Sequence, residues 1–210
     1  MELISERPTI LLLSLEELDF WDEMYSELVN AMAAKATIRR ATKPLNAINY
    51  LTNNTPDAII VTDPAIVEHE SDLVSQKVVE YVRGGGTAVL ATQFSNFVQW
   101  PDLDRWLRAS WDLPWRAGNY TGVTVYLNSK GPARFLNQSG LPEEYEQKAL
   151  FLMNVAKEAA VYHSTSRSWE TESKQRSVVF AKIGYGWLGY IGDVNTEAAS
   201  QAALLAMCGL

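Results

Sequence analysis

Short apolar runs with the character of buried strands alternate with amphipathic segments through the first half of the chain. Residues 9–15, 58–62 and 87–92 are largely apolar and have the length of a strand, as in a parallel sheet that is covered on both faces. Apolar residues recur at helical spacing over residues 20–34, and again from Ser71 to a glycine triplet at 84–86. Strands connected by helices form right-handed βαβ units. The pattern therefore predicts an α/β fold with a parallel sheet.

The second half of the chain has a less regular pattern. Its expected strands are short, at 121–127, 150–154, 159–162, 178–183 and 187–194, and the last two indicate a hairpin. An acidic segment at 143–146 predicts a helix or turn, and residues 196–208 predict a final helix. The polar stretch 164–177 predicts a loop, either a lid over a site or a disordered insertion. No internal repeat or linker is found, so we expect one domain over residues 1–210.

The charge balance and the cysteine content exclude several classes of function. The chain has 18 Lys and Arg residues against 25 Asp and Glu residues, which gives a net charge of −7. A nucleic-acid or anionic-membrane binder needs a positive surface, so neither partner is expected. The single cysteine, Cys208, allows no intrachain disulfide. Since no stretch approaches the roughly 18 apolar residues of a membrane span, we expect a cytoplasmic protein.

Four segments carry a resemblance to a known family. They are PDAIIVTD at 56–63, YVRGGGTAVLATQ at 81–93, LPEEYEQKALFL at 141–152 and GYGWLGYIGDVNTEAASQAALLAMCG at 184–209. Together with the Trp-rich segment ending at Tyr120, they resemble the class I glutamine-amidotransferase-like superfamily, closest to its trehalose-utilisation (ThuA-like) branch. The resemblance implies a flavodoxin-like three-layer α/β/α sandwich with a mostly parallel sheet and a small antiparallel extension.

The resemblance also implies that this chain is not a glutaminase. The superfamily's glutaminases place a cysteine after the strand that residues 87–92 resemble, and a histidine and a glutamate in a late segment. Here Thr92 and Gln93 stand at the first position, Asp193 stands where the histidine would be, and Asn195 stands in place of the glutamate. A carboxylate and an amide cannot replace an imidazole as the base near neutral pH. We therefore expect a pseudoenzyme with respect to glutamine hydrolysis.

Five polar residues follow different strands at the same predicted edge of the sheet: Asp63, Gln93, Ser95, Asp193 and Asn195. In open α/β sheets, ligands bind outside the carboxyl ends of the strands. Convergent polar side chains there could orient a small polar, sugar-like metabolite through hydrogen bonds. The alternative is that these residues cap helices and turns. Our leading hypothesis is metabolite binding at this edge.

Two other hypotheses stay open at this point. An enzyme of sugar modification would use Asp193 or His163 for acid–base chemistry. A structural or interaction protein would form a homo-oligomer and keep a vestigial site. The two histidines and one cysteine offer no metal-ligand spacing, and no sequence pattern indicates another cofactor, so neither a metal nor a cofactor is expected.

Four tryptophans crowd into residues 100–115. Aromatic faces pack against sugar rings, but large aromatics are equally common in cores and subunit interfaces. We expect Trp106 and Trp111 to be core or interface residues. Trp100 and Trp115 are the candidates for an apolar wall of the ligand site.

Overall fold

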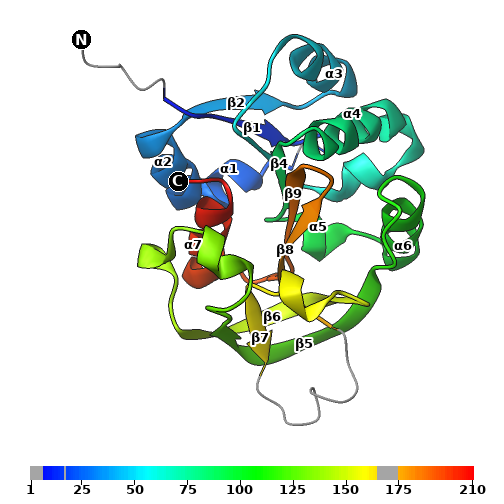
Figure 1. The fold of residues 1–210 in the computed structure, drawn as a ribbon. Helices are drawn as coiled ribbons and strands as arrows, with labels where there is room; N and C mark the ends of the chain where they lie inside the picture. Colours follow the sequence, from blue (N-terminus) through cyan, green and yellow to red (C-terminus); the bar gives the residue numbers. More distant parts are fainter. Residues whose placement is uncertain (1–6, 17, 165–174) are drawn as a thin grey trace.

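A six-stranded sheet forms the centre of the computed structural model, which describes residues 7–16, 18–164 and 175–210 (Figure 1). From edge to edge its strands are β2 (Thr37–Ala41), β1 (Thr9–Leu13), β3 (Ala58–Val61), β4 (Thr87–Leu90), β9 (Gly186–Ile191) and β8 (Val178–Ile183). The first five run parallel, and β8 pairs antiparallel with β9. The predicted α/β fold with a mostly parallel sheet is confirmed.

Helices cover both faces of this sheet (Figure 1). On one face lie α1 (Trp21–Met24), α2 (Ser26–Lys35) and α7 (Ala198–Met207), and on the other α3 (Pro44–Asn53), α4 (Asp72–Arg83) and α6 (Trp100–Ala109). Alternate strand residues point to opposite faces, so Ile10 packs with the first group and Leu11 with the second. The result is a three-layer sandwich with a core on each side of the sheet, consistent with a flavodoxin-like arrangement.

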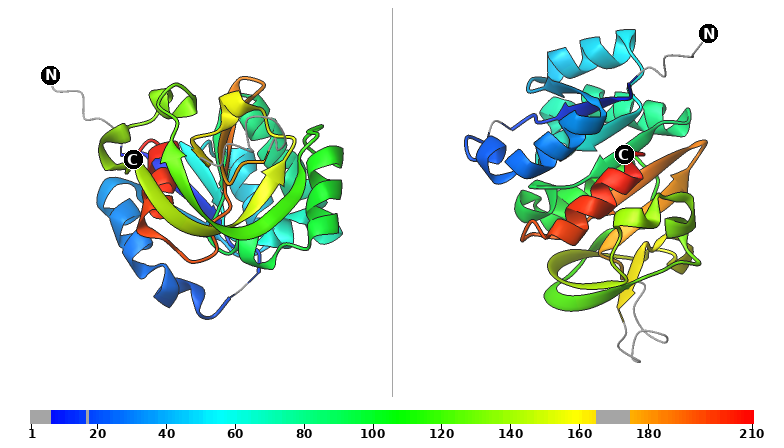
Figure 2. Two further views of the ribbon diagram at one scale, coloured as in Figure 1. Left: turned by 90° about the horizontal axis from the view of Figure 1, so that it is seen from below. Right: turned by 90° about the vertical axis from the view of Figure 1, so that its left-hand side faces the viewer.

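A second, antiparallel sheet lies beside the β8 edge of the sandwich (Figure 2). Its strand order is β6–β5–β7, with β5 at Arg116–Leu127, β6 at Glu144–Met153 and β7 at Tyr162–Ser164. Isolated bridges connect it and its loops to the main sheet, pairing Ala149 with Asp193 and Ala160 with Val179. This sheet is the small antiparallel extension that the sequence predicts.

Three details of the sequence prediction are wrong. The acidic segment 143–146 is the start of β6, because it pairs in register with residues 124–126 of β5 and so gains ladder hydrogen bonds. Of the expected strand at 159–162, only Tyr162 lies in a strand, as the first residue of β7; Ala159 ends a 3₁₀ turn (Lys157–Ala159), and Ala160 forms an isolated bridge with Val179. The expected helix at 20–34 is divided into α1 and α2 at Tyr25.

One prediction lies largely outside the described residues: most of the polar loop 164–177 falls in the range 165–174. Among the helices of the described ranges, none combines the length and the apolar character that crossing a membrane requires.

Candidate functional site

Asp63 lies at the carboxyl end of β3, beside the end of β1. The chain leaves β1 and β3 in opposite directions across the sheet, so this is its topological switch point, where open α/β folds bind ligands. One oxygen of Asp63 accepts hydrogen bonds from the backbone N–H groups of Ala65 (3.1 Å) and Glu16 (3.2 Å), and the other accepts one from the Thr62 hydroxyl (3.1 Å). Asp63 is 1% exposed. It therefore connects the loop after β1 to the loop after β3.

Gln93 and Ser95 follow β4 and are also buried. The Gln93 amide donates to the Tyr25 hydroxyl (3.1 Å) and to the Met24 sulfur, while its carbonyl oxygen accepts from the Asn96 amide (2.8 Å). The Ser95 hydroxyl donates to the backbone oxygen of Ile191 (2.9 Å), which fastens the short helix α5 (Phe94–Phe97) to the end of β9. Both side chains are used within the fold.

Asp193 and Asn195 lie in the connection between β9 and α7. The two oxygens of Asp193 accept from the backbone N–H groups of Asn195 (2.9 Å) and Glu197 (2.7 Å). The Asn195 side chain instead lies on the outer side, where it lines a shallow polar depression with Lys148 and Glu197. The contacts of Asp63 and Asp193 are those of capping residues, which is the alternative that the sequence leaves open.

The space left beside Asp193 is small. A cavity of about 20 Å³ is bounded by Tyr25, Thr92, Asp193 and Ser200, among others, which is room for about one water molecule. Burial, together with the nearby Asp193 carboxylate, raises the pKa of Tyr25, so this phenol stays protonated at neutral pH. A sugar ring does not fit here without displacing the side chains that close the edge.

Thr92 has an unusual backbone conformation that the sequence does not reveal. Its φ is 58°, in the left-handed region, which is costly for a β-branched residue. The Thr92 hydroxyl donates to the backbone oxygen of Thr62 (2.9 Å) and lies 3.4 Å from the Trp21 indole nitrogen. The sharp turn is present, but its hydroxyl proton is engaged by the backbone.

The structure does not bring His163 and Asp193 to one place. His163 is an exposed residue of β7, paired with Tyr126, whereas Asp193 lies against Ala149 of β6. Strand β5 lies between β6 and β7. Within the described ranges, no group of three or more His, Cys, Asp or Glu residues is arranged to hold a metal ion.

The four tryptophans occupy different environments. Trp106 and Trp111 are buried in the core and pack edge to face with ring centroids 5.8 Å apart, as predicted. Trp100 is 48% exposed at the start of α6. Trp115 is nearly buried, and it lines a separate groove beside the edge strand β8.

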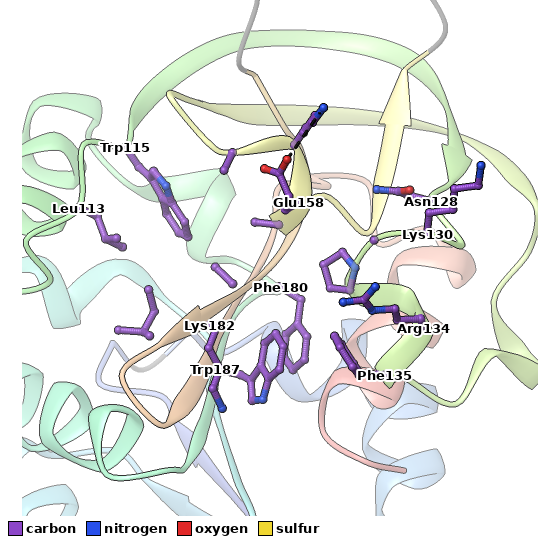
Figure 3. A pocket seen from close by; sticks show the side chains of 17 residues that line it. Leu113, Trp115, Asn128, Lys130, Arg134, Phe135, Glu158, Phe180, Lys182 and Trp187 are labelled. Atoms are coloured by element: carbon purple, nitrogen blue, oxygen red, sulfur yellow. Dashed lines mark ion pairs between the residues drawn. The ribbon is translucent and has the colours of Figure 1, made fainter.

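This groove, which we call the β8 groove, has a volume of about 630 Å³ and straddles the open edge of β8 (Figure 3). Leu113 and Trp115 form one wall. Arg134 and Phe135, from a 3₁₀ turn (Pro132–Phe135), form the opposite wall. A pocket of this size accommodates a small metabolite.

Three aromatic rings and two cations lie along the floor of the β8 groove. The Phe180 and Trp187 rings are stacked with centroids 4.7 Å apart and planes within 5°. The Lys182 ammonium lies 5.0 Å from the Trp187 ring centroid. On the facing turn, the Arg134 guanidinium lies 4.5 Å from the centroid of Phe135, which packs against Trp187 at 5.6 Å. The three rings form a row with Trp187 in the middle, and the two cations lie over Trp187 and Phe135.

Sequence reasoning missed the β8 groove except for Trp115. Its residues come from the turn at 132–135, the turn at 157–159 and the hairpin at 178–187, which are far apart in the chain. Each residue alone has the appearance of a surface lysine or a core aromatic. The available signal is the pair Lys182 and Trp187, which face each other across the predicted hairpin, but hairpin pairing alone does not indicate a groove.

Comparison with solved structures identifies proteins of similar fold. A ThuA-like protein from Bacteroides uniformis aligns with 97% of this chain and 91% of its own, at 10% identity and a TM-score of 0.56. A cytoplasmic protein from Salmonella typhimurium aligns over 96% and 98%, at 9% identity and a TM-score of 0.62. A β-galactosidase from Bacillus circulans covers 97% of this chain at 13% identity and a TM-score of 0.57.

These likenesses establish the fold and no more, because all three identities are below 25%. This chain spans only 31% of the β-galactosidase, so the similarity concerns one part of that enzyme. No family model matches the sequence, and no curated protein matches it. The chain therefore shares its architecture with ThuA-like proteins across nearly its whole length.

Proposed function

We propose that this chain is a non-glutaminase domain of the amidotransferase-like type that binds a small polar, sugar-like metabolite in the β8 groove. The observation that carries the proposal is the groove itself, about 630 Å³ and lined by Trp115, Phe135 and Trp187 together with polar side chains. Apolar rings with a few polar groups are the usual lining of a metabolite site. Thr92 at the sharp turn after β4 supports the absence of glutaminase chemistry, since it supplies no thiol.

The proposed location differs from the edge that the sequence favours. There, Asp63, Gln93, Ser95 and Asp193 are buried and hydrogen-bonded within the protein. The cavity that Asp193 lines has a volume of only about 20 Å³. Binding at that edge would need these hydrogen bonds to break, and each buried group left unpaired costs about 1–3 kcal/mol. The β8 groove requires no such rearrangement.

The sugar part of the proposal has two supports. The exposed Phe135 and the half-buried Trp187 offer apolar surface of the kind that sugar rings pack against. Solved structures of similar fold include a ThuA-like protein and a β-galactosidase. A cytoplasmic location is part of the proposal as well, since one similar structure is called a cytoplasmic protein and a single cysteine suits a reducing compartment.

The test is isothermal titration with a panel of mono- and disaccharides and their phosphates, on wild type and on Phe135→Ala. Phe135 is 60% exposed, so its truncation is expected to leave folding intact while reducing affinity about tenfold. Tyr185→Ala is the matched control, because Tyr185 is an even more exposed aromatic outside the groove. Equal affinity in both variants, or no binding by any sugar, contradicts the proposal.

A second candidate function, self-association, is favoured by one further observation. Four large apolar side chains gather near the carboxyl end of the sheet at 40–48% exposure: Phe20, Met24, Phe97 and Trp100. The Phe20 and Phe97 rings pack with centroids 6.3 Å apart, and such exposed aromatic groups are typical of interfaces. Light scattering is expected to show a dimer or larger species that Trp100→Gln weakens. A monomer at all concentrations contradicts this function.

A further inference from the structure

We propose that the β8 groove binds its ligand through a phosphate group, so that the ligand is a sugar phosphate. This inference rests on the proposed function and specifies its ligand class. The first observation is a contrast in charge. The whole chain carries −7, yet the described residues that line the groove include four cations and a single acid, Glu158; the cations are Lys130, Arg134, Lys157 and Lys182. An acidic protein has concentrated positive charge around this groove.

The second observation concerns the partners of these cations. The one acid of the lining, Glu158, lies 4.0 Å from the Lys157 ammonium. In the described part of the chain, no carboxylate lies within ion-pair distance of Lys130, Arg134 or Lys182. Three cations that share a groove and lack a counter-charge repel one another, and a bound anion removes that repulsion.

The third observation is that two of these cations are held in place. The Arg134 guanidinium lies over Phe135, and the Lys182 ammonium lies over Trp187 and donates to the backbone oxygen of Tyr185 (2.5 Å). Cation–π contacts of this kind contribute about 0.5–1 kcal/mol at exposed sites. They restrict the cations before the ligand arrives, and this lowers the entropy cost of binding.

A phosphate monoester suits this arrangement better than a carboxylate does. It carries close to two negative charges at neutral pH and offers three acceptor oxygens. The planar guanidinium of Arg134 can bind two of these oxygens at once, and lysine ammonium groups add point charges. With phosphate beside Arg134, the part of the 630 Å³ groove toward Leu113 and Trp115 is free for a sugar ring.

The experiment is titration calorimetry with three probes: glucose, glucose 6-phosphate and inorganic phosphate. Wild type is expected to bind glucose 6-phosphate at least tenfold more tightly than glucose, with an affinity that falls as salt is added. Arg134→Gln and Lys182→Gln are each expected to reduce glucose 6-phosphate affinity about tenfold. Lys148→Gln is the matched control, because Lys148 also lies over an aromatic ring, Tyr120, but outside the groove.

The outcomes separate the two proposals. Equal affinity for glucose and glucose 6-phosphate overturns the phosphate inference and leaves sugar binding in the groove standing. Inorganic phosphate binding as tightly as glucose 6-phosphate supports the anion site and overturns the sugar assignment. Equal losses in Lys148→Gln and Arg134→Gln overturn the location. Because Arg134 and Lys182 are exposed, unchanged melting temperatures without ligand are expected to show that both variants fold.

Discussion

The carboxyl edge of the sheet and the β8 groove both gather polar side chains, but the two regions use them differently. At the edge, Asp63 and Asp193 are nearly inaccessible to solvent, and each accepts two backbone N–H bonds. In the groove, Arg134 and Lys182 are exposed and have no carboxylate partner within the described chain. The polar groups of the edge are hydrogen-bonded within the protein, whereas the cations of the groove are available to a ligand.

This difference teaches that a fold's usual ligand position is not by itself evidence of a ligand. Buried polar groups must be paired, and those of the edge are paired with the chain's own backbone. We therefore expect substitutions at the edge to change stability without changing affinity, and substitutions in the groove to do the reverse. Substitutions at three edge residues test this separation of stability from affinity, and we take them from the largest expected effect to the smallest.

The largest effect is expected for Asp193→Ala. This change removes the carboxylate that accepts from the part-buried backbone N–H groups of Asn195 and Glu197, and a hydrogen bond to a charged group contributes about 1.5–3 kcal/mol. We expect the free energy of unfolding, measured in urea, to fall by about 2–4 kcal/mol. Affinity for glucose 6-phosphate, measured below the unfolding transition, is expected to stay within twofold of wild type.

Asp193→Asn serves as the control for this prediction. Its amide oxygen can still accept one of the two backbone bonds, so about half of the loss is expected. If Asp193→Ala is as stable as wild type but no longer binds the sugar phosphate, Asp193 is a ligand-binding residue. The comparison between edge and groove would then be wrong.

The next effect is a pH dependence that originates at Asp63. Burial raises the pKa of this carboxyl to about 6, against hydrogen bonds from Ala65, Glu16 and Thr62 that lower it. The native state therefore holds the proton more tightly than the unfolded chain does, whose pKa is near 3.8. The contribution of Asp63 to stability is present in full below about pH 4, declines as the pH rises to about 6, and is constant above that.

Asp63→Asn isolates this contribution, because its amide oxygen can still accept from the N–H groups of Ala65 and Glu16. A shift of two pKa units corresponds to about 3 kcal/mol at most. We expect the stability of wild type relative to the variant to decrease by up to that amount between pH 4 and pH 7 in urea unfolding. A difference that is constant across this range would show that Asp63 is ionised throughout, as in an open and solvated edge.

Much of the fold follows from the sequence because its signals are local. The apolar runs at 58–62 and 87–92 and the hairpin at 178–194 carry their own periodicity, and the structure has β3, β4, β8 and β9 there. The prediction for residues 143–146 is wrong because three of them are acidic, a composition untypical of a strand. Their strand conformation depends on the pairing of β6 with β5. The sequence of either segment alone does not reveal such pairing.

The site was less predictable for the same reason. The sequence correctly places Asp63, Gln93 and Asp193 at the end of strands, but whether such groups face a ligand or a backbone N–H depends on loops that meet only in three dimensions. The β8 groove is lined by segments more than 40 residues apart, such as the turn that holds Arg134 and the strand that holds Lys182. The strained turn at Thr92 contains no glycine, so the sequence does not indicate its left-handed conformation.

The smallest predicted effect concerns Thr92 and tests whether the edge stores strain in a closed structure. Alanine is ordinarily more stable than glycine by about 0.5–1 kcal/mol within regular structure, but a left-handed conformation costs a residue with a side chain roughly 1–2 kcal/mol. Because Thr92→Ala and Thr92→Gly both lose the hydroxyl bond to Thr62, comparing the two variants isolates the backbone. We expect Thr92→Gly to be more stable by about 1 kcal/mol in urea unfolding. The same two substitutions at Ser95, within helix α5, are expected to show the opposite order of stability. If the alanine variant is the more stable one at both positions, the turn at Thr92 relaxes and the edge can open.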